Sequence, residues 1–533
     1  MKILGIHKDP WHDTGAAVIR DDGDGPRYVH VAEERLDRVK NSRAFPKRSA
    51  EACLAAAGIG SMEDLDLVVM DHIRDGTDWR RDHFRQPCRT DVFLADVPPD
   101  RLRIINHHLA HACSAFYSSP FPRAAVLVVD GRGSNDETQS LWRAGPQGLE
   151  LVSHTTCIGI GLLYAAVTQA IGFGLLQEGK TMGLAPYGGQ GPRIFEFPHV
   201  FDGIVTDYAG FCAWGSYNIL APHPPLDSFE AKAQAAWEVQ DECERAMLHL
   251  ARHAREATGE EYLCISGGVG LNSVANYKVL QSGIFRDIFV NPACSDTGIA
   301  LGAALYGYHV EGKAGHRQAG ISPYIGPVYN QERIDRALAG IGLPVLDADV
   351  VRQATRLLVG NAILGCFQGG SEMGPRALGN RSILVNPLIA DNKDRLNERV
   401  KHREHFRPFA PAVLVERVSE YFDLDRPCPH MLMVALIRPE KRSLIPAVTH
   451  VDGTGRLQTV AKKDNPVFYS LIEAFGRETG VPVLLNTSFN VNGEPIVETP
   501  EDAVRCFLGT EINALLIGER LVLKPAAEEI LGR

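Results

Sequence analysis

Short apolar runs, each followed by a polar turn and a second apolar run, recur in the first part of the chain. Residues 3–6 lead through such a turn to residues 16–19, and residues 126–129 lead through a Gly-containing turn to residues 139–142. Each pair is predicted to form two strands joined by a turn. The local pattern is therefore the same in two separate places.

Strands and helices alternate along the rest of the chain. Apolar positions spaced by three and four residues predict helices, and short apolar runs bounded by glycines predict strands. The predicted helices cover residues 47–58, 106–117 and 230–258, and further strands cover residues 262–266, 362–367 and 481–485. This alternation predicts an α/β protein.

One uncharged stretch, residues 155–177, is long enough to cross a lipid bilayer. Several glycines together with Thr168 and Gln169 interrupt it, and no second stretch accompanies it. We therefore predict a buried helix here and no membrane association.

The length of 533 residues predicts at least two domains. The two similar hairpins are typical of the duplicated nucleotide-binding fold of the actin and hexokinase type, which we expect over residues 1–330. The alternation relaxes near residue 315 and resumes after Arg333, so the boundary is placed between about 320 and 345. A second α/β domain is expected over residues 345–533.

The composition of the chain indicates which partners and which cellular compartment to expect. The 55 Lys and Arg residues against 65 Asp and Glu give a formal charge of −10, which argues against a nucleic-acid partner. Eleven cysteines without a Cys-x-x-Cys pair argue against a disulfide framework and suit a reducing compartment. The short apolar run that ends at His7 and Lys8 does not resemble a signal peptide. A cytoplasmic protein is expected.

A metal site is predicted in the first domain. His107 and His111 lie four residues apart in a predicted helix, so both imidazoles project from one face. Asp130 ends a predicted strand, and Asp296 precedes a helix of small residues over 299–306. Two histidines and two aspartates would suit Fe(II), Mn(II) or Zn(II), whereas an isolated histidine pair is also common in ordinary cores.

An anion site is predicted in the second domain. Residues 376–407 contain eight Lys or Arg against four Asp or Glu, within an otherwise acidic chain. Arg376 and Arg381 lie among tight glycine turns, where guanidinium groups can grip phosphate with two hydrogen bonds. Arg456 and the polar run over 486–490 add further hydrogen-bonding groups. The alternative is a solvated basic surface.

These residues together resemble the O-carbamoyltransferase family of antibiotic and nodulation-factor biosynthesis, and the resemblance spans nearly the whole chain. It rests on ordered motifs at residues 12–17 (His-Asp-Thr-Gly-Ala-Ala), 33–35 (Glu-Glu-Arg), 106–111 (Asn-His-His-Leu-Ala-His), 178–188, 266–272 (Ser-Gly-Gly-Val-Gly-Leu-Asn), 374–382, 406–411 and 486–490. The family usually has an arginine shortly before Glu372, where this chain has Gly370 and Ser371. That difference puts part of the anion site in doubt.

The resemblance implies what each domain does. A first domain like the tRNA threonylcarbamoyl transferase would be followed by a YrdC-like domain, which converts carbamoyl phosphate and ATP, with Mg(II), into a carbamoyl adenylate. The first domain would then pass the carbamoyl group to a hydroxyl of a small molecule, with AMP as the leaving group. The expected ion is Fe(II), with Mn(II) or Zn(II) as alternatives, held by His107, His111, Asp130 and Asp296.

The resemblance also assigns further residues. In the second domain, carbamoyl phosphate and the adenylate would contact Arg376, Lys401, Arg407, Arg456, Asn486 and Ser488, with Arg376 and Lys401 acting in catalysis. In the first domain, the nucleotide would lie against Lys180, Gly267, Gly268 and Asn272. We expect His12 to deprotonate the acceptor hydroxyl and Asp13 to orient it, because an imidazole titrates near neutral pH.

Two other functions stay open at this point. Threonylcarbamoylation of tRNA uses both domain types, but the acidic charge and the absence of a basic stripe argue against it. A sensor that binds nucleotide without transferring a group would not require both the arginine cluster and the His–Asp set. The sequence does not name the acceptor, although residues 190–228 are a plausible specificity loop, and it leaves a homodimer open.

Overall fold

The computed structural model describes residues 1–8, 12–72, 97–214, 217–314 and 320–532. Their contacts divide the chain into two compact units, and each is described by itself. Unit 1 comprises Met1–Glu34 and Asn41–Ile321, and unit 2 comprises Arg35–Lys40 and Ser322–Arg533. The short segment Arg35–Lys40 therefore packs with the later part of the chain, which the linear division predicted from the sequence does not include.

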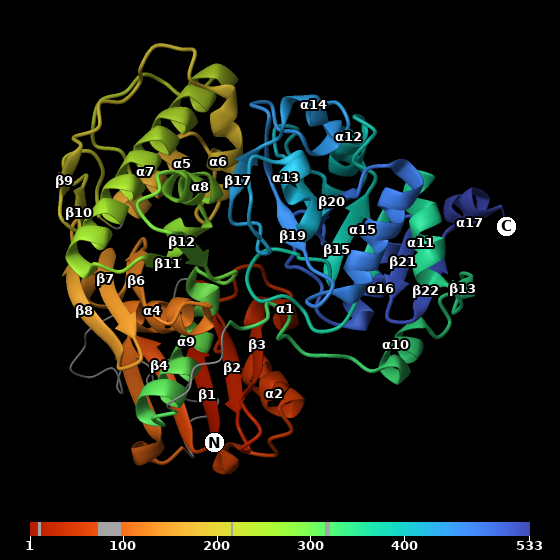
Figure 1. Ribbon diagram of the computed structural model, residues 1–533, viewed down its shortest axis with the longest axis horizontal. Helices are drawn as coiled ribbons and strands as arrows, with labels where there is room; N and C mark the ends of the chain where they lie inside the picture. Colours follow the sequence, from red (N-terminus) through yellow and green to blue (C-terminus); the bar gives the residue numbers. More distant parts are fainter. Residues whose placement is uncertain (9–11, 73–96, 215–216, 315–319, 533) are drawn as a thin grey trace. The chain divides into compact units, whose positions relative to one another are not determined.

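Unit 1 contains two five-stranded sheets with the same pattern of pairing (Figure 1). Each has three antiparallel strands followed by two parallel ones, in the orders β3-β2-β1-β4-β5 and β8-β7-β6-β11-β12. The strands are β1 Lys2–His7, β2 Gly15–Arg20, β3 Arg27–Ala32, β4 Leu67–His72, β5 Leu102–Asn106, β6 Ala124–Val129, β7 Gln139–Gly145, β8 Gly148–Thr155, β11 Tyr262–Ser266 and β12 Asp287–Val290. The two hairpins predicted from the sequence are confirmed as β1–β2 and β6–β7.

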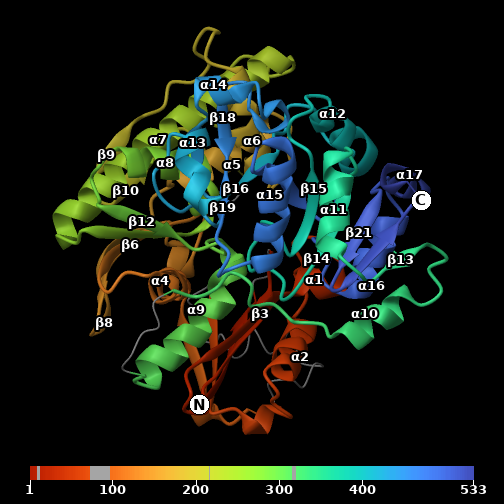
Figure 2. The same ribbon diagram turned by 45° about the vertical axis from the view of Figure 1, so that its right-hand side comes forward.

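Two helices fill the space between these sheets. Helix α4 (His107–Ser118) packs on β6 and β11, helix α9 (Ile299–Tyr306) packs on β1, β2 and β4, and the two helices contact each other (Figures 1 and 2). Their interface is close because Gly302 of α9 has no side chain there: a Cβ on Gly302 would lie 1.9 Å from the carbonyl oxygen of Ala110. This packing fixes α4 and the start of α9 side by side, which positions the site described below.

The remaining helices of unit 1 include one long helix. Helix α7 runs over Phe229–Thr258, begins with the Ser228 side chain as N-cap, and ends at Gly259 in the left-handed region. The middle of the uncharged stretch 155–177 forms α5 (Ile160–Ala170), which packs against α7 with most of its residues buried. Further elements are α2 Lys47–Ala56, α6 Glu178–Leu184, α8 Ser273–Gln281, β9 Val200–Asp202 and β10 Val205–Asp207, while α1 Glu33–Asp37 begins in unit 1 and ends in unit 2. Within the described ranges, no helix is both long and apolar enough to cross a membrane.

Unit 2 is built on one mixed eight-stranded sheet in the order β13-β22-β21-β14-β15-β20-β16-β19, and a two-stranded ribbon pairs β17 with β18. The strands are β13 Val345–Leu346, β14 Leu364–Phe367, β15 Arg381–Val385, β16 Ala410–Leu414, β17 Val434–Leu436, β18 Thr454–Arg456, β19 Gln458–Val460, β20 Val483–Ser488, β21 Ala514–Ile517 and β22 Arg520–Leu523. The helices are α10 Gln331–Leu338, α11 Val350–Val359, α12 Asn392–Leu396, α13 Val418–Tyr421, α14 Pro439–Arg442, α15 Pro466–Thr479, α16 Pro500–Leu508 and α17 Pro525–Leu531. Apolar residues of α11, α15 and α17 form one buried core with the sheet. Both units are therefore of mixed α/β class.

Candidate functional site

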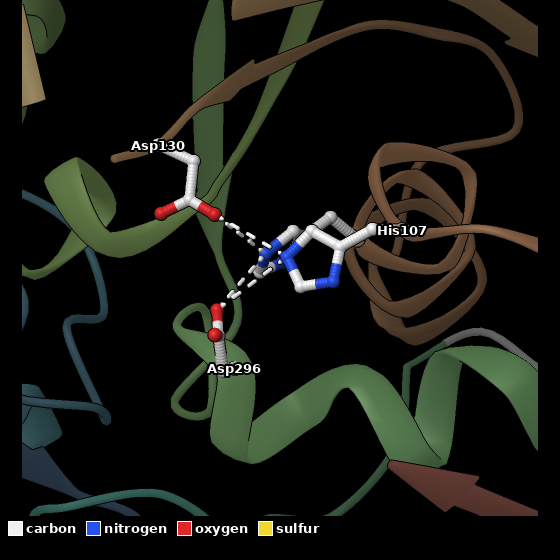
Figure 3. A group of neighbouring side chains, drawn as sticks. His107, Asp130 and Asp296 are labelled. Atoms are coloured by element: carbon white, nitrogen blue, oxygen red, sulfur yellow. Dashed lines mark hydrogen bonds and ion pairs between the residues drawn. The ribbon is translucent and has the colours of Figure 1, made fainter. Parts of the chain in front are cut away.

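Unit 1 brings together the four residues that the sequence predicted as metal ligands. His107 and His111 lie one turn apart on α4. Asn106 is the N-cap of this helix, and its side-chain oxygen accepts a hydrogen bond from the main-chain N–H of Leu109 at 2.9 Å. Asp130 directly follows β6, and Asp296 opens the turn that leads into α9. Figure 3 shows His107 between the two carboxylates. The helix pair between the sheets therefore places the four side chains in one cluster.

The distances within this cluster are short. The Nε2 of His107 lies 3.4 Å from Oδ2 of Asp130 and 3.6 Å from Oδ1 of Asp296. The Nε2 of His111 lies 3.3 Å and 3.4 Å from the same two atoms. One potential ligand atom from each of the four residues lies within 4.8 Å of the others. All four residues are buried.

The electrostatics of the cluster are strongly perturbed. Burial lowers the pKa of His107, but the nearby Asp296, Asp130 and Asp71 carboxylates outweigh it and raise the pKa well above its ordinary value. Burial raises the pKa of Asp296, but the charge of His107 and the nearby imidazoles of His111 and His12 bring the pKa well below its ordinary value. In the absence of an ion, a proton on His107 thus offsets part of the carboxylate charge.

This donor set fits a divalent ion that accepts nitrogen and oxygen ligands. Nε2 of His111 is buried and makes no hydrogen bond within the described structure, although two carboxylate oxygens face it. Buried polar atoms are rarely left without a partner. An ion bound between the carboxylates and the imidazoles would satisfy this atom and both negative charges.

His12 lies at the edge of the same cluster. Its Nδ1 is 3.8 Å from Oδ2 of Asp296 and 3.4 Å from Oδ2 of Asp13, and one quarter of its side chain is exposed. Asp13 in turn accepts a hydrogen bond from Asn41 at 3.0 Å. The structure thus brings the pair predicted as base and orienter to the cluster, and their roles stay a prediction.

The two glycines predicted at the nucleotide have a structural reason of their own. Gly267 has φ +87°, and a Cβ there would lie 2.2 Å from the carbonyl oxygen of Val129. The N–H of Gly268 donates to Oδ1 of Asp130 at 2.9 Å. This turn therefore lets β11 approach the end of β6 and holds a predicted ligand, and a role toward nucleotide stays a prediction.

Asn272 and Lys180, which were also predicted to contact the nucleotide, make contacts within the protein. The Asn272 side chain accepts from the N–H of Ala275 as the N-cap of α8 and exchanges hydrogen bonds with Gln240 at 2.9 and 3.2 Å. Both ends of its amide are thus occupied within the protein. Lys180 is half-buried on α6, with its Nζ 5.5 Å from the ring centre of Phe173. Their assignment to nucleotide also stays a prediction.

Helix α7 anchors the first part of the predicted specificity loop. Gln234 accepts from the main-chain N–H of Gly189 and Gly191, and Glu238 accepts from those of Ile194 and Phe195, all between 2.8 and 3.1 Å. One turn further, Glu242 accepts a hydrogen bond from the Tyr208 hydroxyl at 2.9 Å. Among the described residues of the loop, the part before Tyr208 is thus tied down by three side chains on one face of α7.

The sequence analysis missed two residues next to the cluster, Asp71 and His7. The Asp71 carboxylate lies 2.8 Å from Nδ1 of His107 through one oxygen and 2.8 Å from Nδ1 of His7 through the other. Their positions at strand ends could have indicated them. His7 and Asp71 lie at the carboxyl ends of β1 and β4, just as Asp130 directly follows the carboxyl end of β6.

Unit 2 contains a cluster of positive charges. Burial, followed by the charges of Arg376, Arg403 and Arg407, lowers the pKa of Arg456 well below its ordinary value. Arginine keeps its proton in proteins, so this direction means that the charges repel one another and that a bound anion would relieve the repulsion. Nε of Arg456 is buried and donates to no residue in the part of the chain that the structure describes. Arg403, which the sequence did not single out, joins the predicted Arg376, Arg407 and Arg456.

Lys401 is buried beside the predicted Ser488. Its ammonium group contacts the Ser488 carbonyl oxygen, the Ser488 Oγ at 3.2 Å, and the Asn490 Oδ1 and carbonyl oxygen at 2.8 and 3.0 Å. Burial, with the charges of Arg403 and Arg407, lowers the pKa of Lys401 well below its ordinary value. Because these acceptors engage all three protons of the ammonium, Lys401 holds the segment 488–490 in place, and a catalytic role stays a prediction.

Asn486 lies on β20 with its amide turned into the protein. Its Nδ2 donates to Gln458 at 2.8 Å and to the carbonyl oxygen of Ala377, next to Arg376, at 3.3 Å. Its Oδ1 is buried and accepts no hydrogen bond from the described residues. Asn486 therefore links the predicted anion loop to the sheet.

Arg381 occupies a different environment from the one that its motif predicts. The side chain is fully buried, stacks 3.7 Å from the ring centre of Phe367, and donates to the carbonyl oxygens of Gln368 and Gly369. Its two Nη groups are thus used within the protein, whereas its buried Nε donates to no described residue, and a role in gripping phosphate stays a prediction. Nearby, Glu372 accepts from the main-chain N–H of Leu378, Asn380 and Arg381, which shapes the same loop.

Two α/β units, one with a buried His–Asp cluster and one with clustered arginines, indicate an enzyme whose substrates carry negative charge. Comparison with known families makes this specific. Residues 88–202 and 226–305 match the carbamoyltransferase N-terminus, and residues 355–524 match the carbamoyltransferase C-terminus. The chain belongs to the carbamoyltransferase family.

Related proteins agree with this assignment. The nodulation protein NolNO of Sinorhizobium fredii is 38% identical over 97% of this chain and 79% of its own length. The nodulation protein NolO of Bradyrhizobium diazoefficiens is 40% identical over 79% of each chain. The 3'-hydroxymethylcephem-O-carbamoyltransferase of Amycolatopsis lactamdurans is 35% identical over 65% of this chain and 64% of its own length. The family assigned from sequence motifs is thus confirmed.

Solved structures are less similar. The HypF protein of T. kodakarensis has a TM-score of 0.36 and 14% sequence identity, and the similarity covers 58% of this chain and 48% of that chain. This similarity is too low to support a statement about fold or ligands.

Proposed function

We propose that this carbamoyltransferase activates a carbamoyl group in unit 2 and transfers it to a hydroxyl of a small-molecule acceptor in unit 1. In unit 2, carbamoyl phosphate, ATP and one water would give carbamoyl adenylate, pyrophosphate and inorganic phosphate. The observation that carries the proposal is the separation of two chemistries: a cationic cluster in unit 2 and a His–Asp cluster in unit 1. The repeated sheets of unit 1 support the actin- and hexokinase-like fold expected for it.

The cations of unit 2 would hold the phosphates during activation. Arg376, Arg407 and Arg456 would neutralise carbamoyl phosphate and the ATP phosphates, whose Mg(II) would carry part of the remaining charge. Positive groups fixed before the substrate binds stabilise charge without reorganisation. Lys401 would keep Ser488 and Asn490 in place beside the substrates.

In unit 1, His107, His111, Asp130 and Asp296 would hold a divalent ion, with Fe(II) expected first and Mn(II) or Zn(II) as alternatives. That ion would supply a Lewis acid for the carbamoyl centre and a binding point for phosphate oxygens. His12 would accept the proton of the acceptor hydroxyl while its oxygen attacks the carbamoyl carbon, and AMP would leave with the bonding electrons of the C–O bond.

Other proteins of the family support the acceptor class. The Amycolatopsis lactamdurans relative is a 3'-hydroxymethylcephem-O-carbamoyltransferase, a name that describes carbamoyl transfer to the oxygen of a hydroxymethyl group on a cephem. We propose a hydroxyl acceptor of the same chemical kind for this chain.

The test is to incubate the purified protein with carbamoyl phosphate, ATP, Mg(II) and Mn(II) without an acceptor, and to measure pyrophosphate and carbamoyl adenylate by mass spectrometry. We expect adenylate from the parent and at least about 100-fold less from Arg376→Ala, because one catalytic charge contact is worth about 3 kcal/mol. Arg417→Ala is the matched control, since Arg417 is exposed and paired with Glu420.

Equal adenylate formation by the parent and Arg376→Ala would contradict the assignment of the anion site. Adenylate from threonine and bicarbonate, with none from carbamoyl phosphate, would instead support threonylcarbamoylation of tRNA.

A further inference from the structure

We propose that Asp71 is a positioning residue of the metal centre, whose carboxylate fixes the rings of His107 and His7 and thereby orients the ligands. This inference rests on the metal centre of the proposed function. The proposed transfer gives Asp71 no role of its own, and its side chain is 1% exposed. A carboxylate buried so completely requires a reason, because desolvation of its charge is costly.

The fold explains why these three residues meet. Strands β1, β4 and β5 are parallel neighbours, and their pairing sets Ile6 opposite Met70 and His72 opposite Asn106. His7 and Asp71 therefore lie side by side at the carboxyl ends of β1 and β4. Helix α4 begins immediately after β5, which places His107 against Asp71 from the other side.

The hydrogen bonds select one arrangement of each ring. A carboxylate only accepts, so a hydrogen bond to Asp71 at 2.8 Å requires the proton on Nδ1 of His107. The lone pair of the neutral ring then lies on Nε2, the atom that faces Asp130 and Asp296. A carboxylate behind a histidine ligand fixes the ring and its tautomer and raises its affinity for the ion.

The second oxygen of Asp71 reaches the ligand set by another route. It lies 2.8 Å from Nδ1 of His7, whose Nε2 is buried, makes no hydrogen bond in the described structure, and lies 4.0 Å from Oδ2 of Asp296. The other oxygen of Asp296, Oδ1, faces His107 and His111. Asp71 thus contacts one ligand directly and holds His7 within 4.0 Å of a second one.

The distances favour this arrangement over a second ion between His7, Asp71 and His107. An ion at about 2.0–2.2 Å from a ring nitrogen and a carboxylate oxygen holds these two atoms about 3 Å or more apart. Both contacts of Asp71 are 2.8 Å, which is an ordinary hydrogen-bond distance.

The experiment is a titration of the metal-free, full-length protein with Co(II) alone, followed by the absorption spectrum of the bound ion. Asp71→Asn keeps the shape of the side chain but removes its charge, and we expect it to lower Co(II) affinity about 10- to 100-fold and to change the spectrum. Ser140→Ala is the matched control, because Ser140 holds Nδ1 of His108, the neighbour of His107 on α4 that is not a predicted ligand. This control should leave affinity and spectrum unchanged.

A second variant covers the case in which Asp71→Asn does not fold. His7→Asn leaves the contact between Asp71 and His107 in place and should still alter the spectrum, with a smaller loss of affinity. Affinity and spectrum equal to the parent in folded Asp71→Asn, or in His7→Asn when only that variant folds, would overturn the inference and leave the metal centre intact. No binding of Co(II) by the parent would overturn the metal centre and this inference together.

Discussion

His107 is the residue whose charge state links the metal centre to pH. In the metal-free protein its pKa is raised well above the ordinary value, since the three carboxylates around it outweigh its burial. A raised histidine pKa adds stability below about pH 6.5, the ordinary value, and this stability is lost as the pH rises through the raised pKa. The protonated ring cannot bind a metal ion.

We therefore expect metal affinity to increase with pH. A bound ion must displace the proton of His107 at neutral pH, so each displaced proton should change the apparent affinity about tenfold per pH unit. The measurement is the Mn(II) dissociation constant at several pH values between about 6 and 8, together with the protons released into weak buffer. A flat affinity over this range, with no proton release, would contradict the raised pKa.

Arg456 lies at the centre of the cationic cluster in unit 2. Its charge is unfavourable in the folded protein without a ligand, because burial and three neighbouring arginines oppose it. We expect Arg456→Gln to raise the free energy of unfolding of the ligand-free protein by about 1 kcal/mol and to abolish stabilisation by inorganic phosphate. Thermal unfolding with and without phosphate measures both effects. Arg417→Gln should change neither, and a destabilised Arg456→Gln that phosphate still protects would refute this account.

At the scale of elements, the turn between β11 and α8 packs against the end of the neighbouring strand β6. Gly267 is in the left-handed region and touches the backbone of Val129, while the next N–H holds Asp130. Gly267→Ala must therefore move β6 or the turn, and we expect a loss of about 2 kcal/mol or more in unfolding free energy, with weaker metal binding.

Gly259→Ala is the comparison for this prediction. Gly259 ends α7 at φ +71°, and nothing lies within 4 Å of a Cβ added there. The Gly259→Ala variant should therefore lose only the cost of a left-handed backbone at a non-glycine residue, about 1 kcal/mol of unfolding free energy. Chemical unfolding and Mn(II) titration of both variants distinguish the two effects. If the two variants lost the same unfolding free energy and both kept full metal affinity, the close approach of Gly267 to Val129 would contribute nothing to stability.

At the scale of the whole molecule, unit 2 depends on a segment that lies far from it in the sequence. Arg38 donates to the carbonyl oxygens of Ile496 and Pro495 at 2.7 and 2.8 Å, and Arg35 donates to that of Gly374 at 3.0 Å. All of these residues belong to unit 2. Loss of the two Arg38 hydrogen bonds should remove about 1–3 kcal/mol of local stability.

We expect Arg38→Ala in the full-length protein to increase hydrogen exchange around residues 495–502 and to leave the strands of unit 1 unchanged. Mass spectrometry of peptic fragments measures this difference. Arg333→Ala is the control, because its exposed ion pair with Glu501 contacts the start of α16, within residues 495–502, without binding the main chain. Faster exchange of equal size in both variants would rule out a specific role for the Arg35–Lys40 segment.

The sequence by itself determined the local elements, the two hairpins and the identity of four clustered side chains. Spacing on α4 and the ends of strands are local patterns, so His107, His111, Asp130 and Asp296 could be predicted before their distances were known. Family membership also followed from ordered motifs. The domain boundaries and the roles of the site residues stay predictions.

Only the tertiary structure decided which residues support these sites. Asp71 and His7 meet His107 because three parallel strands end together, a relation that no spacing in the sequence records. Arg381 is a core residue whose two Nη groups donate to the carbonyl oxygens of Gln368 and Gly369, although its motif resembles an anion loop. Long-range packing sets such contacts, and local sequence pattern carries little information about it.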